Sequence, residues 1–256
     1  MIAKYQQFLD SSNFFTTEAD YINYLLNQND LDIVIDFGCN LGNLANKILT
    51  NSSIKKYYGI DAVPEYLTLS KKFINDDRFI PIDGYITNSQ NIKEYFSIDL
   101  NNLVATSTEL YTQPGYRVKL SQAISPTEWL ATYLPLFHSN VYCKIDIDVK
   151  NGEDIDLLDL ILNTGVGGIQ IELNVDNYDK FISTNLIEKL TKLNFLLPTE
   201  FFNQFDSKSQ FANLAVTKKG WWYQLAVPDD LKRNFELTSS SSWGNQNKET
   251  ITTTLS

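Results

Sequence analysis

Strands and helices alternate along this chain, and that alternation restricts the fold more than any other feature. Short runs rich in β-branched and aromatic residues recur between stretches whose apolar residues follow helical spacing. Because two parallel strands need a long crossover between them, usually a helix, this order predicts a parallel sheet covered by helices on both faces. The expected strands are 32–37, 56–61, 79–82, 141–146 and 169–173, and the expected helices are around 41–49, 64–75, 154–162 and 186–193.

The later part of the chain departs from strict alternation. Two last strands, near 195–202 and 211–217, are expected to pair as an antiparallel hairpin, and 102–120 is expected to be extended around a turn at 113–115. The fold class that we predict is α/β, a Rossmann-like and mostly parallel sheet of seven strands. It should carry a C-terminal antiparallel hairpin and helices on both faces.

Three segments are expected along the chain. Residues 1–30 should form an N-terminal helical segment with Thr17 as a helix cap, and residues 31–237 should form the domain that holds the sheet. Residues 238–256 are rich in Ser, Thr and Asn, so we expect a polar and poorly ordered tail.

Composition disfavours several classes of partner. The net charge is −10, with 31 acidic against 21 basic residues, whereas nucleic-acid binding relies on Lys and Arg to neutralise phosphates. No apolar run reaches the roughly 20 residues that span a bilayer, and the first residues lack the apolar core of a signal peptide. Cys39 and Cys143 lie in apolar stretches and are expected to be reduced thiols. We therefore expect a cytoplasmic protein without a nucleic-acid or membrane partner, and leave homodimer formation open.

The most informative segment is a glycine-containing turn between the first strand and the next helix. Asp36 lies near the end of that strand, and Gly38 and Gly42 let the backbone turn tightly and approach a ligand. Asp61 ends the second strand, 25 residues after Asp36. A carboxylate there can accept hydrogen bonds from both hydroxyls of an adenosine ribose. These residues predict a nucleoside-containing cofactor at the carboxyl edge of the sheet.

Two cofactor classes compete for this site. A dinucleotide fingerprint has glycines at relative positions one, three and six, and counting from Gly38 the last two positions hold Asn40 and Asn43. S-adenosylmethionine (SAM) carries no pyrophosphate, and its ammonium and sulfonium groups are cations that suit an acidic residue such as Asp36. We predict SAM. The alternatives are an NAD- or NADP-dependent oxidoreductase and a non-catalytic SAM-binding module.

At these residues the chain resembles a known family. The segment Asp-Phe-Gly-Cys-Asn-Leu-Gly at 36–42 resembles the D-x-G-A-N-x-G motif of the FkbM-like class I SAM-dependent methyltransferases, with Cys39 in place of alanine. Residues 59–66 resemble that family's acidic residue followed by proline. Residues 143–146 resemble the K-I-D that opens its K-I-D-V-E-G-x-E motif, and residues 169–173 resemble its next strand, which ends in glutamate.

The resemblance covers about residues 30–200 and departs from the family through two extra residues before Gly152 and Glu153. It implies a methyltransferase domain over 31–237 and SAM-dependent O-methylation. The implied acceptor is a hydroxyl of a sugar, a glycan or another small molecule.

Acidic residues near the ends of the central strands are the candidates for catalysis. A hydroxyl nucleophile benefits from a base that takes its proton, and we predict Asp146, Asp148 and Glu172 as the catalytic residues. Two of them could instead hold a divalent cation, an alternative that we do not predict. Lys144 is expected to pair with Asp146 or Glu172 in a structural role. The residues predicted to bind the cofactor are Asp36, Gly38, Cys39, Asn40, Gly42, Asn43, Asp61, Ala62, Asp83 and Gly84.

Overall fold

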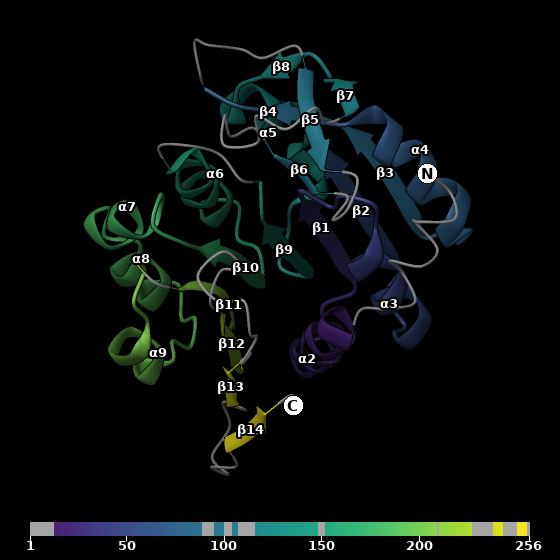
Figure 1. Ribbon diagram of the computed structural model, residues 1–256. Helices are drawn as coiled ribbons and strands as arrows, with labels where there is room; N and C mark the ends of the chain where they lie inside the picture. Colours follow the sequence, from purple (N-terminus) through teal and green to yellow (C-terminus); the bar gives the residue numbers. More distant parts are fainter. Residues whose placement is uncertain are drawn as a thin grey trace.

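The computed structural model describes residues 13–88, 95–99, 104–106, 116–147, 152–208, 210–226, 238–242 and 250–254. A sheet of seven strands runs through its centre (Figure 1). Five strands are parallel: β1 (Ile33–Phe37), β2 (Lys56–Asp61), β3 (Phe79–Asp83), β9 (Val141–Ile145) and β10 (Gly168–Leu173). Two form an antiparallel hairpin at one side of the sheet: β11 (Phe211–Thr217), which pairs with β10, and β12 (Trp221–Ala226).

The order of the strands in space confirms the predicted fold class. That order is β12, β11, β10, β9, β1, β2 and β3. The chain therefore runs outward from β1 through β2 to β3, and then returns to β9 on the other side of β1. Ligands of such open α/β sheets bind outside the carboxyl ends of the strands, at the point where the strand order reverses. In this sheet that point lies between β1 and β9.

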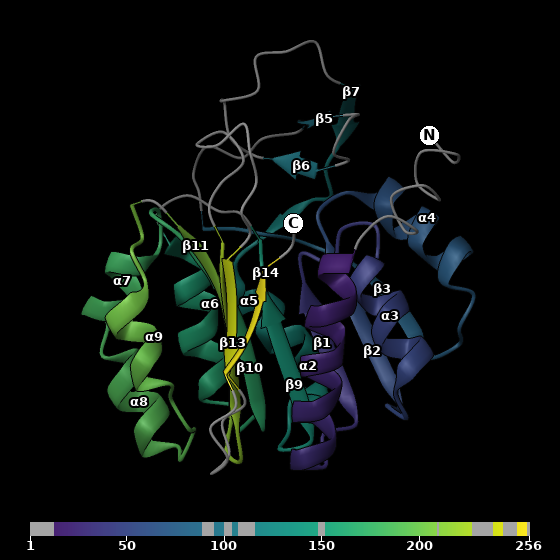
Figure 2. The ribbon, with the colours of Figure 1, turned by 60° about the horizontal axis from the view of Figure 1, so that its bottom comes forward.

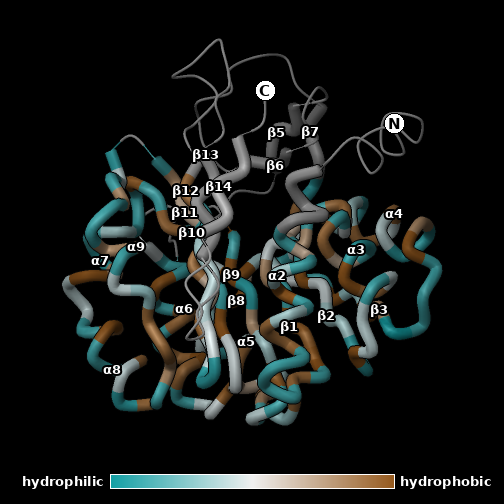
Figure 3. Tube along the Cα trace, turned by 90° about the horizontal axis from the view of Figure 1, so that it is seen from below, coloured by the Kyte–Doolittle hydropathy of each residue, from teal (hydrophilic) through white to brown (hydrophobic). Residues whose placement is uncertain are grey.

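Helices cover both faces of the sheet (Figures 1 and 2). One face carries α2 (Asn13–Asn29), α3 (Asn43–Asn51) and α4 (Pro64–Ile74). The other face carries α5 (Pro126–Tyr133), α6 (Glu153–Leu162), α7 (Tyr178–Ser183), α8 (Leu186–Lys192) and α9 (Thr199–Gln204). Hydrophobic and hydrophilic residues alternate along the helices in Figure 3, as expected of helices with one buried side.

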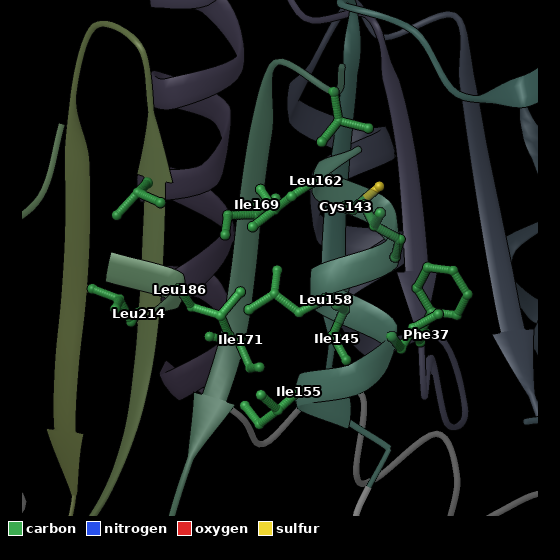
Figure 4. Packing of buried hydrophobic residues seen from close by; sticks show 14 of the residues in the cluster. Phe37, Cys143, Ile145, Ile155, Leu158, Leu162, Ile169, Ile171, Leu186 and Leu214 are labelled. Atoms are coloured by element: carbon green, nitrogen blue, oxygen red, sulfur yellow. The ribbon is translucent and has the colours of Figure 1, made fainter. Parts of the chain in front are cut away.

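Two apolar clusters pack against the two faces. Ile35 and Phe37 of β1 belong to the larger cluster, together with residues of α5 to α9. Figure 4 labels Phe37 together with Leu158 of α6 and Leu186 of α8 from this cluster. Val34 belongs to the cluster beneath α2 and α3. Because side chains alternate between the two faces of a strand, Asp36 points to the same face as Val34. This places Asp36 on the α2 side of the sheet.

A smaller set of strands is inserted between β3 and β9. β4 (Tyr85–Ile86) pairs with β8 (Ala123–Ile124). β5 (Tyr95–Asp99) pairs on its two sides with β6 (Val104–Thr106) and β7 (Tyr116–Lys119). Figure 2 shows this three-stranded sheet beyond the carboxyl edge of the large sheet. The extended character predicted within 102–120 is confirmed for β6 and β7, whereas the turn at 113–115 lies outside the described residues.

The final hairpin is built from other residues than predicted. Residues 195–202 form no strand, because Phe201 and Phe205 lie four residues apart on one side of α9 and its C-terminal end, and both bury their rings. The partner of β11 is β12, which begins after a turn at 218–220. The hairpin itself is confirmed and its first strand is corrected.

Other boundaries also differ from expectation. α2 begins at Asn13, so Thr17 lies inside the helix and is not its cap. In the tail, β13 (Thr238–Ser242) and β14 (Thr250–Thr254) pair antiparallel, and neither strand was predicted. α5 was not predicted, although Ser125 and Glu128 form a capping box at its start. Among the described residues, no helix has the length and apolar character needed to cross a membrane.

Candidate active site

The carboxyl ends of the parallel strands gather predicted site residues at one edge. Asp61 and Asp83 are register partners at the ends of β2 and β3, and Glu172 lies near the end of β10. Asp146 directly follows β9, and its backbone N–H donates to the carbonyl oxygen of Phe37 in β1 at 2.9 Å. The structure thus brings these four acids to the edge where the strand order reverses.

The turn after β1 has an unusual backbone. Gly38, Asn40 and Gly42 have φ angles of 84°, 51° and 76°, and glycine and asparagine tolerate this left-handed region best. Asn43 then begins α3. A Cβ atom on Gly38 would lie 1.8 Å from the carbonyl oxygen of Asp146. Glycine at position 38 is therefore required for the close approach of β1 and the segment after β9.

Asp61 joins this turn to the second strand. Its Oδ2 accepts a hydrogen bond from the backbone N–H of Asn40 at 2.8 Å, and its Oδ1 accepts one from Val63 at 2.9 Å. Burial raises the pKa of the Asp61 carboxyl to about 6, although both N–H groups favour the charged form. A carboxylate has about four acceptor positions, so two remain for further donors.

Cys39 fills the space beneath the turn. It is a buried free thiol, and a Cβ atom on Gly59 would lie 2.9 Å from its Sγ. Burial, and then the neighbouring carboxylates of Asp61 and Asp36, raise the pKa of this thiol well above its usual value. The geometry therefore gives the Cys39 side chain a packing role in the turn.

The loops after β2 and β3 are joined by Ser121, which sequence reasoning did not select. Its backbone N–H donates to the carbonyl oxygen of Ala62 at 3.0 Å, and its hydroxyl contacts the carboxylate of Asp83. The backbone N–H of Gly84 donates to the carbonyl oxygen of Asp61, also at 3.0 Å. Ser121 is 38 residues from Asp83, with the small sheet between them, so no sequence spacing indicates this contact.

A groove of about 570 Å³ begins at Asp83 and lies between α4 and β3. Proline, leucine, threonine and lysine side chains line it. They are Pro64, Leu67, Thr68, Lys71, Lys72 and Pro81.

Asp36, which the sequence analysis predicts to bind the cofactor, is buried in the core. Only 1% of the residue is exposed, and its Oδ2 accepts a hydrogen bond from the hydroxyl of Tyr57 at 2.6 Å. Its Oδ1 lies 3.5 Å from Nζ of Lys144. The structure thus places the Asp36 carboxylate below the turn, against a cation of the protein, and away from the open edge.

Lys144 connects this buried acid to the edge. Its Nζ donates to Oδ2 of Asp146 at 2.9 Å, so the predicted pairing with Asp146 is confirmed. Burial lowers the pKa of Lys144, but Asp146, Asp36 and Glu18 outweigh that effect and raise it well above its usual value. The ammonium group therefore stays charged inside the core. The side chain of Asp146 is 30% exposed.

Glu18 brings a further acid into the core from α2. Its Oε1 accepts a hydrogen bond from Nε2 of Gln170 at 2.6 Å, and that amide also contacts Asn213 and Tyr142. Burial raises the pKa of Glu18 to about 7, and the nearby Lys144 lowers it less. Sequence reasoning did not select Glu18, because its partner Gln170 lies 152 residues away along the chain.

Glu172 lies beside a second buried network at the end of β10. Nδ2 of Asn177 donates to the backbone carbonyl oxygen of Glu172 at 2.9 Å and to Oδ2 of Asp154 at 2.5 Å. Burial raises the pKa of Asp154 to about 6. Asp148, the third predicted catalytic residue, lies outside the described residues.

The edge therefore combines several carboxylates with a glycine turn. Within the described part of the chain, no three His, Cys, Asp or Glu side chains come together as metal ligands. The arrangement suits a molecule with hydroxyl groups and positive charge, held between the loops after β1, β2 and β3.

Comparison with known proteins gives matches of structure alone. No protein-family model matches this sequence, and no curated protein sequence does. The methyltransferase domain of bacterial CtHen1-C has 13% sequence identity and a TM-score of 0.45, covering 79% of this chain and 97% of that one.

Two further solved structures are similar at the same level. Magnesium protoporphyrin IX methyltransferase (ChlM) from Synechocystis, solved with bound SAM, has 10% identity and a TM-score of 0.37, covering 73% of this chain and 76% of that one. M. jannaschii TYW2, solved in complex with AdoMet, has 14% identity and a TM-score of 0.36, covering 74% and 67%. These similarities concern the fold at most, so the chemistry must come from the residues of the site.

Proposed function

We propose that this protein is a SAM-dependent methyltransferase that binds its cofactor over the carboxyl ends of β1, β2 and β3. The carrying observation is the direct bond between the glycine turn and Asp61, in which the backbone N–H of Asn40 donates to the carboxylate at 2.8 Å. When bound, SAM supplies a methyl group that is already activated on a sulfonium.

Three features of the chain fit this cofactor. Asp61 retains acceptor capacity for two ribose hydroxyls after its two backbone bonds. Glycine at position 84 lets the loop after β3 pack close to Trp129, because a Cβ atom there would come within 3.1 Å of Ile60 and 3.2 Å of Nε1 of Trp129. That buried indole N–H has no hydrogen-bond partner among the described residues. Asp83, at the same loop, offers a carboxylate to an exocyclic amine.

The charge of the edge favours SAM over a dinucleotide. Asp61, Asp83 and Asp146 all lie there, and the ammonium of Lys144 is already shared between Asp146 and Asp36. A pyrophosphate would meet carboxylates in place of donors, whereas a sulfonium and an ammonium would be attracted to them. The NAD- or NADP-dependent oxidoreductase therefore remains the weaker alternative.

For the acceptor we propose a hydroxyl of a sugar, a glycan or another small molecule. Asp146 is the residue that we assign to contact the reacting hydroxyl, because its partly exposed carboxylate lies at the point where the strand order reverses. Glu172 is the second candidate on the neighbouring strand, and Asp148 is a third candidate from the sequence. Proximity and alignment supply most of the rate enhancement in such a displacement, and a base adds to it.

The setting of this activity follows from the same reasoning. We propose that residues 31–237 form the methyltransferase domain, with residues 1–30 as a helical segment and 238–256 as a polar tail. The excess of acidic residues favours a small acceptor over nucleic acid. A cytoplasmic location agrees with two free cysteines, and homodimer formation can be checked by sedimentation.

The first test is calorimetric titration with S-adenosylhomocysteine (SAH), the demethylated product of SAM. We expect micromolar binding, at least about tenfold weaker in Asp61→Ala because a charged acceptor of hydrogen bonds is lost. The matched control is Asp20→Ala, which removes the same charge from an exposed site on α2 and should bind as the wild type does. No binding at millimolar SAH would contradict the proposal, and binding of NAD or NADP in its place would support the oxidoreductase. Binding of SAH without methyl transfer to any hydroxyl acceptor would favour the non-catalytic module.

A further inference from the structure

Lys144 is buried in the core, yet it reaches the open edge of the sheet. Only 5% of the residue is exposed. Its side chain lies on the α2 face of β9, level with Asp36 of β1 and with Gln170 of β10 in the strand register. Asp146 is two residues further along the chain and therefore on the same side. The ammonium group stands between a fully buried acid and a partly exposed one.

Stability alone gives no reason for a lysine at this position. Buried ion pairs are often no more stabilising than apolar residues of similar size, because both charges lose their hydration. The sheet face around Lys144 also includes apolar side chains such as Val34. We therefore interpret this ion pair as an interaction that holds the partly exposed carboxylate of Asp146 in place.

Both the backbone and the side chain of Asp146 are held by other residues. Its backbone N–H donates to Phe37 at 2.9 Å, and its carbonyl oxygen packs against Gly38. Its carboxylate receives Nζ of Lys144 at 2.9 Å. Lys144 is itself held by Asp36, whose other oxygen is bonded by the hydroxyl of Tyr57. A chain of contacts therefore runs from the interior of the sheet to the exposed carboxylate.

We propose that Lys144 is a positioning residue, which fixes the carboxylate of Asp146 in the orientation needed beside the transferred methyl group. This inference rests on the proposed function, because it requires SAM at the carboxyl edge. Lys144 contacts neither the cofactor nor the acceptor in this role, and it acts through Asp146. Asp36 and Tyr57 support it from below.

The test uses the full chain with SAM labelled by ¹³C at the S-methyl group, so that no acceptor is needed. Lys144→Met, Asp146→Asn and the double variant are each compared with the wild type at saturating SAM, so that a loss of affinity caused by the removed charge does not enter the comparison. We expect the bound methyl resonance to move from its wild-type position in both single variants, in the same direction. The double variant should move it no further than Asp146→Asn alone, because Lys144 acts only through Asp146.

An unmoved methyl resonance in Lys144→Met would overturn the inference while leaving the proposed function intact. Displacements that add in the double variant would overturn it too, because they would show a path that bypasses Asp146. Failure of the wild type to bind SAM or SAH would remove the proposed function first, and this inference with it.

Lys144→Met leaves Asp36 without its cation and can fail to fold for that reason alone. The variant that combines Asp36→Asn with Lys144→Met removes both charges, so its unfolding temperature should return toward that of the wild type. If Lys144 positions Asp146, the methyl resonance should stay displaced in this double variant even though its stability is restored. Recovery of the wild-type resonance together with the unfolding temperature would show a merely structural role and overturn the inference.

Discussion

The carbonyl oxygen of Asp146 occupies the place where a side chain on Gly38 would begin. A Cβ atom at position 38 would lie 1.8 Å from that oxygen, and the backbone N–H of Asp146 is bonded to Phe37, the residue before the glycine. The glycine turn that we assign to the cofactor and the acid that we assign to catalysis are thus one structural unit. A substitution in the turn should therefore alter the position of Asp146, and a substitution of Asp146 should alter the turn.

Replacement of Gly38 by alanine tests this unit. Both the positive φ of 84° and the clash with Asp146 oppose a side chain, so we expect a loss of about 3 to 5 kcal/mol or failure to fold. Gly165→Ala is the matched control, because Gly165 has the same φ of 84° with nothing within 4 Å of an added Cβ. It should lose only about 1 to 2 kcal/mol. Equal losses in urea unfolding would show that the contact with Asp146 is unimportant.

Much of the fold was predictable because its signals are local. The strand that ends near Asp36, the turn at Gly38 and the strand that ends at Asp61 each follow from residues adjacent in the sequence. Their meeting at one edge then follows from parallel pairing. The pairing of Lys144 with Asp146 was predictable for the same reason, since residues two apart in a strand share a face.

What could not be predicted depends on contacts between distant segments. Ser121 reaches Asp83 across 38 residues, and Glu18 reaches Gln170 across 152, so neither appears in a local pattern. The segment 195–202 has the aromatic residues of a strand, but burial of Phe201 and Phe205 along one side decides for a helix. Tertiary packing overrides propensity in such short elements.

Asp61→Asn should separate cofactor binding from stability. Burial raises the pKa of Asp61 to about 6, so its ionised form costs stability above that pH, and asparagine removes this cost. Asparagine also replaces one of the two oxygens that accept backbone N–H bonds by a donor. Because this loss offsets the gain, we expect only a small change of the unfolding temperature at pH 7.5, while SAH binding weakens by at least about tenfold. In the wild type, SAH binding should also weaken as the pH falls through 6, because the protonated acid is a poorer acceptor. A variant whose affinity matches the wild type at pH 7.5 would show that Asp61 does not hold the ribose.

Glu18→Gln should change how stability depends on pH. The folded protein raises the pKa of Glu18 from 4.5 to about 7, so between these values the native state binds more protons than the unfolded state. Stability therefore falls as the pH rises through this window. We expect the wild type to lose about 2 to 3 kcal/mol more than Glu18→Gln between pH 5 and pH 8 in urea unfolding. Parallel pH profiles would show that Glu18 titrates as it does in the unfolded chain.

Asn177→Ala should destabilise the protein most at high pH. The Asn177 side chain bonds the carboxylate of Asp154 and the carbonyl oxygen of Glu172, and its removal takes a hydrogen-bond donor away from the buried carboxylate of Asp154. We expect a loss of about 2 to 4 kcal/mol at pH 8. The loss should be smaller at pH 5, because the pKa of Asp154 is about 6 and the protonated acid needs its partner less. Asn163→Ala, which removes an exposed amide from the end of α6, should change stability by less than about 0.5 kcal/mol at either pH. A loss in Asn177→Ala that does not depend on pH would show that Asp154 stays in one protonation state across this range.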